Sequence, residues 1–111
     1  MISSMTKPEI IAEATRRLID FYHPLRIYLF GSEARNEATP DSDLDFLVVL
    51  PDDTPEATFK SGAIYAHLSG LGLPKDVIPL RESDFNLRAA HVKASLPAAV
   101  LREGKLLYAS S

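Results

Sequence analysis

The chain contains no cysteine, so disulfide bonds and cysteine-ligated zinc sites are excluded. Its three histidines are scattered along the sequence and do not form a histidine-rich metal site. No stretch approaches the roughly 20 apolar residues of a membrane span. The N-terminus lacks the basic region and apolar region that make up a signal peptide. We therefore expect a cytoplasmic protein that does not act at a membrane.

Basic residues form no run, and Arg16-Arg17 is the one adjacent basic pair in a chain of net charge −3. Proteins that bind a nucleic-acid backbone normally present a basic surface. We therefore expect no direct nucleic-acid partner. The 111 residues, 46% of them hydrophobic, are enough for one domain with its own core. We expect that domain to span residues 1–111, with its core at about 7–108.

A capping box of Thr6 and Glu9 predicts the start of a helix over residues 7–21, and His23-Pro24 predicts its end. The continuous apolar run in 44–50 predicts a central strand that is covered on both faces. Apolar residues at helical spacing support the first helix: Ile11, Ala14, Leu18 and Phe21. The same signals predict strands at 26–30, 44–50, 75–80 and 105–108, and helices at about 55–71, at 84–93 with Ser83 as the cap, and from Pro97 to Gly104.

Two carboxylates, Asp43 and Asp45, open the central strand. In a strand, side chains two residues apart lie on one face, about 6.6 Å apart along the chain. Carboxylates so placed can share one or two Mg²⁺ ions, which prefer a few carboxylates together with substrate phosphates. The alternative is a strand end with solvated acids, because Asp is common in turns.

The first strand leads directly into Gly31-Ser32, which opens a polar turn with one predicted helical turn at 33–36. Glycine lets the backbone approach a phosphate closely, and successive N–H groups can form an anion-binding nest. A simple turn is the alternative, and the P-loop pattern Gly-x-x-x-x-Gly-Lys is absent. Arg35 in this turn could contact a nucleotide phosphate or pair with a nearby acid.

Asp76 begins a predicted strand that could lie beside the strand of Asp43 and Asp45. A third carboxylate there could complete a metal site and accept the proton of an attacking hydroxyl. The alternative is a polar residue at a strand end. His67 falls on a predicted helix and His91 near a helix end, where surface or packing roles are the simpler interpretation.

Together these residues resemble the minimal nucleotidyltransferases of the DNA polymerase β superfamily. The resemblance rests on Gly31-Ser32, ten intervening residues, and then Asp43-Leu44-Asp45, which is the family's Gly-Ser-x10-Asp-x-Asp signature. It extends to the third acid, Asp76, and to the ending 101–108, so that it covers nearly the whole chain. It implies an α+β fold in which a small mixed β-sheet is flanked by helices.

The resemblance also implies the chemistry. Gly31, Ser32 and Arg35 would hold the phosphates of ATP. Asp43 and Asp45 would ligate two Mg²⁺ ions, and Asp76 would ligate one of them and help to activate the acceptor hydroxyl. That hydroxyl would attack the α-phosphate, so that AMP is transferred and pyrophosphate is released.

The acceptor is expected to come from another protein, because no acceptor-binding domain is visible in the sequence. Minimal members of this family are commonly antitoxins that adenylylate a tyrosine of a HEPN toxin, which implies a hetero-oligomer of the two proteins. Two alternatives remain. One is a binding module that masks its partner sterically, and the other is a transferase that acts on a small molecule such as an aminoglycoside.

Overall fold

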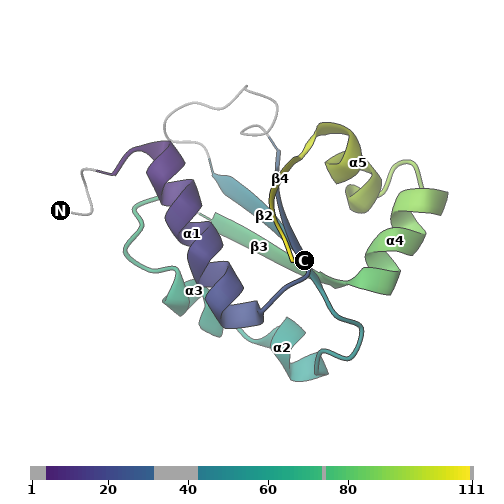
Figure 1. Ribbon diagram of the computed structural model, residues 1–111, viewed down its shortest axis with the longest axis horizontal. Helices are drawn as coiled ribbons and strands as arrows, with labels where there is room; N and C mark the ends of the chain where they lie inside the picture. Colours follow the sequence, from purple (N-terminus) through teal and green to yellow (C-terminus); the bar gives the residue numbers. More distant parts are fainter. Residues whose placement is uncertain (1–4, 32–42, 74, 111) are drawn as a thin grey trace.

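The computed structural model describes residues 5–31, 43–73 and 75–110. Four strands form one sheet in the order β3-β2-β1-β4, and the helices flank it (Figure 1). The predicted α+β fold with a small mixed sheet is therefore confirmed. The elements, in chain order, are α1 (Lys7–Tyr22), β1 (Arg26–Phe30), β2 (Leu44–Leu50), α2 (Glu56–Lys60), α3 (Ala63–His67), β3 (Lys75–Arg81), α4 (Glu82–His91), α5 (Leu96–Glu103) and β4 (Lys105–Ala109).

The sheet is mixed because β2 has two kinds of neighbour. It runs antiparallel to β1 and parallel to β3, while β4 pairs antiparallel with β1 at one edge. The central position predicted for β2 is confirmed, since all of its residues except Asp45 are buried. A strand with covered faces needs no polar alternation, which explains the unbroken apolar run.

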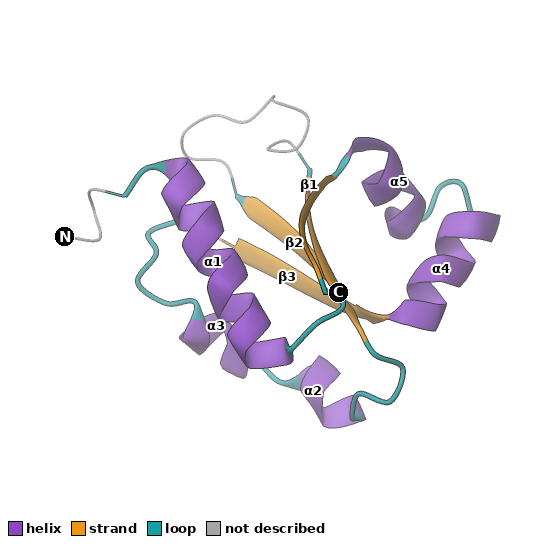
Figure 2. Cartoon of the chain, viewed as in Figure 1, coloured by secondary structure: helices purple, strands orange, loops and turns teal. Residues whose placement is uncertain are grey.

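Each face of the sheet carries its own core. Phe46 and Val48 of β2 pack with α1 and α3 on one face, and Leu47 and Val49 pack with α4 and α5 on the other. Figure 2 shows these two pairs of helices on opposite sides of the strands. Alternate residues of one strand therefore serve two separate cores, as the period of two requires.

Helix α1 begins at the predicted capping box. The hydroxyl of Thr6 accepts a hydrogen bond from the N–H of Glu9, whose carboxylate accepts one from the N–H of Thr6 at 2.7 Å. The helix ends at His23, whose φ of 50° is left-handed. Ala14 and Leu18 are buried as predicted. The ends of the buried stripe are Ile10 and Tyr22, whereas Ile11 and Phe21, which were predicted to belong to it, are only partly buried.

The single helix predicted over residues 55–71 is wrong. Two short helices, α2 and α3, occupy this segment, and Ser61 and Gly62 separate them. Ser61 is extended, with φ −76° and ψ 131°, and its hydroxyl accepts a hydrogen bond from the N–H of Ala63. The hydroxyl of a serine competes for backbone hydrogen bonds, and a glycine loses more backbone entropy in a helix than other residues do. The pair therefore ends one helix before the next one starts.

Helix α4 begins at Glu82 and not at the predicted residue 84, and it ends at His91 and not at residue 93. Ser83 is not its cap. The N–H of Ser83 instead donates to the carboxylate of Asp52, in the turn after β2, at 2.9 Å. Helix α5 starts one residue before Pro97, and the hydroxyl of Ser95 caps it.

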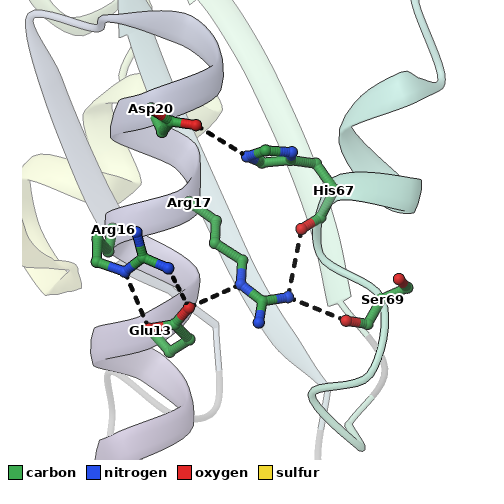
Figure 3. Close-up of polar contacts among 6 residues, drawn as sticks. All are labelled: Glu13, Arg16, Arg17, Asp20, His67 and Ser69. Carbon is green, nitrogen blue, oxygen red and sulfur yellow. Dashed lines mark hydrogen bonds and ion pairs between the residues drawn. The ribbon is translucent and has the colours of Figure 1, made fainter.

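Polar contacts attach α1 to the end of α3 (Figure 3). The carboxylate of Glu13 accepts a hydrogen bond from Arg17 at 2.8 Å, and Arg17 donates to the carbonyl groups of His67 and Ser69 at 3.3 and 3.0 Å. His67 also lies 3.3 Å from the carboxylate of Asp20. These contacts fix the segment that leads into β3. In the described part of the chain, no helix is long and apolar enough to cross a membrane.

Candidate active site

Asp43 and Asp45 lie where β2 begins. Leu44, between them, is fully buried in the core beneath α1. Alternation along the strand therefore places Asp45 on the opposite face, which it shares with Leu47 and Val49 beneath α4 and α5. Asp45 is partly buried, whereas Asp43, just before the strand, is exposed.

Asp76 is the direct neighbour of Asp45 across the parallel strands. The register of β2 and β3 pairs Leu44 with Lys75, Asp45 with Asp76, and Phe46 with Val77. Neighbouring strands lie about 4.8 Å apart, and side chains at paired positions share a face. The third acid predicted from sequence therefore stands beside the second, on the same side of the sheet.

The charges of these acids act on one another. Burial raises the pKa of Asp45 above its ordinary value, and the negative charges of Asp76 and Asp43 raise it further. The negative charge of a partly buried carboxylate is destabilised by the loss of water and by the two negative charges beside it. A cation that binds among them would relieve this repulsion.

Gly31 lies directly beneath the carboxylate of Asp45. The last residue of β1, Phe30, is paired with Asp45, so that Gly31 follows it at the end of the strand. Gly31 has a φ of 82°, a conformation that favours glycine. A Cβ atom at this position would lie 2.6 Å from the Oδ2 atom of Asp45. Any other residue would therefore take space from the carboxylate.

The donor set suits a hard divalent cation, because Mg²⁺ prefers carboxylate oxygens together with substrate phosphates. Among the described residues, no three His, Asp or Glu side chains stand close enough to hold a metal ion as they are oriented. Carboxylates of like charge repel when no cation lies between them. The missing Cβ atom of Gly31 leaves the space that the carboxylate of Asp45 occupies.

Two of the predicted site residues, Ser32 and Arg35, lie outside the described residues, as does the helical turn predicted at 33–36. The histidines do not join the acids: His67 pairs with Asp20 and His91 ends α4.

A small pocket of about 110 Å³ lies next to Gly31, between the end of β1 and helix α5. This pocket was not predicted from the sequence, because its two sides are about 65 residues apart in the chain. The pattern Leu-Pro-Ala-Ala-Val, with small residues on one helical face, is the signal that could have indicated a hollow there. Its lining residues are Phe30, Gly31, Leu96, Ala99, Val100, Glu103 and Gly104.

A four-stranded mixed sheet with helices on both faces is the fold of a nucleotidyltransferase domain. The sequence model of the family described as "Nucleotidyltransferase domain" matches residues 9–101, and the chain belongs to this family. Comparison with curated proteins gave no match.

Three solved structures share the fold. A toxin–antitoxin crystallised with AMP-PNP is 23% identical, with a TM-score of 0.59, over 90% of this chain and 74% of that one. A mutant of the toxin–antitoxin MntA–HpeT is 22% identical, with a TM-score of 0.61, over 89% and 73% of the two chains. A putative nucleotidyltransferase from Sulfolobus solfataricus is 19% identical, with a TM-score of 0.57, over 90% and 78%.

Proposed function

We propose that this nucleotidyltransferase is an antitoxin that transfers AMP from ATP to a tyrosine hydroxyl of a partner HEPN toxin. The observation that carries the proposal is the pairing of Asp45 with Asp76 above the space left by Gly31. Two of the similar folds come from toxin–antitoxin systems, and one of these was crystallised with AMP-PNP, which supports both the partner and the nucleotide.

Asp43, Asp45 and Asp76 would hold two Mg²⁺ ions, and Asp76 would contact one of them. The bound ions would offset the negative charge of the triphosphate and of the pyrophosphate leaving group. The raised pKa of Asp45 is consistent with this role, since a cation would remove the repulsion that the neighbouring acids create.

The residues of the chain perform the remaining steps. Gly31 lets the backbone approach the β- and γ-phosphates, and Ser32 and Arg35 would donate hydrogen bonds to them. Asp76 would accept the proton of the tyrosine hydroxyl as its oxygen attacks the α-phosphorus. The bond from the α-phosphorus to the bridging oxygen breaks, pyrophosphate leaves, and AMP remains on the tyrosine.

The test uses ATP labelled at the α-phosphate, Mg²⁺ and the purified partner toxin. We expect label on the toxin with the wild type, and none with Asp43→Ala/Asp45→Ala. Asp53→Ala is the matched control, because Asp53 is an exposed acid in the turn after β2, away from the site. Replacement of the acceptor tyrosine by Phe in the toxin is expected to abolish the label.

Other outcomes would overturn the proposal. If toxicity were blocked without any label, and Asp43→Asn/Asp45→Asn/Asp76→Asn blocked it equally well, the chain would be a binding module that masks its partner. Label on an aminoglycoside or another small hydroxyl compound, and none on the toxin, would make it a small-molecule transferase.

A further inference from the structure

We infer that the corner between α4 and α5 is a docking surface for an acidic partner protein. The corner consists of Val92 and Lys93, which follow α4, and of Leu101 and Arg102, near the end of α5. The identity of the partner as the toxin rests on the proposed function. The surface itself is argued from exposure, charge and position.

The corner is held together by hydrogen bonds. Arg102 donates to the carbonyl oxygen of Lys93 at 3.2 Å, which ties the end of α5 to the α4–α5 connection. The hydroxyl of Ser95 donates to the carbonyl oxygen of Arg88 at 3.1 Å, and the N–H of Val92 donates to the same carbonyl at 2.9 Å. The two helices lie together on one side of the sheet (Figure 1). A partner would therefore meet a preformed surface and would not have to order a loop.

The corner exposes apolar side chains that nothing in the described part of the chain covers. Leu101 is 54% exposed and Val92 is 49% exposed. Single exposed apolar residues are common on surfaces and need no explanation. Here two of them belong to segments that a hydrogen bond joins, and cationic side chains flank them, which is the arrangement of an interface core with a charged rim.

The charge of the corner is opposite to that of the rest of the chain. Residues 85–111 contain four Lys or Arg against one Glu, whereas residues 1–84 contain eight against fourteen Asp or Glu. Lys93 and Arg102 are both exposed and form no ion pair within the described residues. Arg88, by contrast, is paired with Asp84 at 3.2 Å. Two cations without counterions favour an acidic partner, because complementary charge speeds and orients association.

A protein fits this surface better than a nucleic acid does. Binding to a nucleic-acid backbone depends on many phosphate contacts, and single strands add stacking on aromatic rings. The corner has two cations, Lys93 and Arg102, and no aromatic residue. Its half-exposed Leu101 and Val92 would gain from burial against apolar side chains of a protein.

The corner also lies on the side of the sheet where the acids are. Helix α4 follows β3 without a connecting residue, and α5 lines the pocket beside Gly31. Asp45 shares its face of the sheet with the residues that pack beneath α4 and α5. A protein that docks on the corner would therefore approach the acids from the side on which an acceptor hydroxyl is needed.

The absence of cysteine allows a direct test with single-cysteine variants. Leu101→Cys would carry a benzophenone maleimide at the corner, and Lys60→Cys would carry it on α2, which is not part of the corner. With the purified partner toxin, we expect crosslinking from position 101 and not from position 60. We expect the crosslinked segment of the toxin to contain Asp or Glu beside apolar residues. Equal crosslinking from both positions would overturn the inference. Crosslinking from position 101 to a basic segment of the toxin would also overturn it.

Charge reversal gives an independent measurement. Lys93→Glu/Arg102→Glu is expected to weaken toxin binding about a hundredfold at low salt, with a smaller loss at high salt. Arg16→Glu/Lys60→Glu changes the net charge equally, but on α1 and α2, and is expected to leave the affinity within about twofold. If Lys93→Glu/Arg102→Glu bound the toxin as tightly as the wild type, the docking surface would be refuted. It would also be refuted if the wild type and Arg16→Glu/Lys60→Glu bound a labelled single-stranded RNA and Lys93→Glu/Arg102→Glu did not.

The two proposals fail in different ways. Binding is measured without nucleotide, and AMP transfer is measured separately with labelled ATP. If the wild type bound the toxin but transferred no AMP, and Asp45→Asn bound the toxin equally well, the proposed function would be refuted. The docking surface would remain supported. Normal AMP transfer by Lys93→Glu/Arg102→Glu at low toxin concentration would refute the docking surface alone.

Discussion

The carboxylate of Asp52 accepts a hydrogen bond from the backbone N–H of Ser83 at 2.9 Å, so that the turn after β2 caps the first turn of α4. The side chain of Ser83 is not involved, and the residue before the helix, Arg81, makes no capping hydrogen bond. The start of α4 therefore depends on a residue that lies about 30 positions earlier in the chain.

Replacement of Asp52 by Ala is expected to lower the free energy of unfolding by about 1 kcal/mol, because a first-turn N–H loses its acceptor and the helix dipole loses a favourable charge. Urea denaturation measures the change. Asp53→Ala is the control, since it removes the neighbouring acid, which is exposed and makes no hydrogen bond to α4. Equal losses in the two variants would show that the contact with Ser83 contributes nothing.

Gly31→Ala is expected to abolish nucleotidyl transfer and to lower stability by about 1–2 kcal/mol through its left-handed backbone. The added methyl would lie 2.6 Å from Oδ2 of Asp45 and displace the carboxylate. Gly72→Ala provides a matched control, because Gly72 has a similar φ of 88° but open space around its Cβ position. It should lose stability and keep its activity. If Gly31→Ala also kept its activity, the contact with Asp45 would have no role in catalysis.

Asp45→Asn is expected to leave the metal-free protein as stable as the wild type, or more stable, at neutral pH. The folded pKa of Asp45 lies above its ordinary value of 3.8, mainly because of burial. Ionisation of Asp45 therefore lowers the free energy of unfolding. The whole of this loss is present when the pH is above the folded pKa, and none of it is present when the pH is below 3.8. Thermal unfolding without metal should show an advantage of the variant at pH 7 that disappears as the pH falls toward 3.8. A variant that is less stable at pH 7 would contradict this account.

Mg²⁺-ATP should stabilise the wild type and not Asp45→Asn, because a ligand stabilises the state that binds it and the variant lacks a carboxylate at the site. The difference in melting temperature with and without Mg²⁺-ATP measures the effect. An undiminished shift in the variant would show that Asp45 does not hold a metal ion. Asp53→Asn, with its exposed position in the turn after β2, should behave as the wild type does.

Glu13→Gln is expected to reduce the acid sensitivity of the fold. Hydrogen bonds from Arg16 and Arg17 lower the pKa of Glu13 from 4.5 to about 2. The ionised carboxylate therefore contributes stability that is complete above pH 4.5 and is lost as the pH falls toward 2. Unfolding at a series of pH values should show a flatter slope between pH 4.5 and 2 in the variant. Glu103→Gln, which removes an exposed acid outside this network, should keep the slope of the wild type.

Much of the fold could be predicted because local signals coincide with the structure. The capping box of Thr6 and Glu9, the apolar run of β2 and the spacing of Gly31 from Asp45 are all short-range patterns. They place the first helix and two of the three strands that carry the candidate site, β1 and β2. The prediction of one helix over 55–71 was wrong because it relied on the helical spacing of apolar residues. It did not take into account Ser61-Gly62, a pair that interrupts a helix locally.

The remaining features depend on tertiary pairing. Asp52 caps α4 only because β2 and β3 lie side by side, and no local rule connects it to Ser83. The alignment of Asp45 with Asp76 also depends on strand register, which a shift of one residue would change so that the acids faced opposite sides. The pocket beside Gly31 likewise forms only when α5 packs over β1.

The two edges of the sheet differ in one respect that affects assembly. On β3, the N–H of Val77 points away from β2 and donates to the hydroxyl of Tyr65 at 3.2 Å, and Pro79, which faces the same way two residues later, has no N–H to offer. On β4, the outer edge is open within the described part of the chain. Among the described residues, β3 is therefore the poorer edge for strand addition, because two of its outward positions offer no free N–H group. Copies that meet edge to edge would therefore pair through β4 first, which gives a closed pair, whereas a fibril would need the weaker β3 edge of each molecule as well.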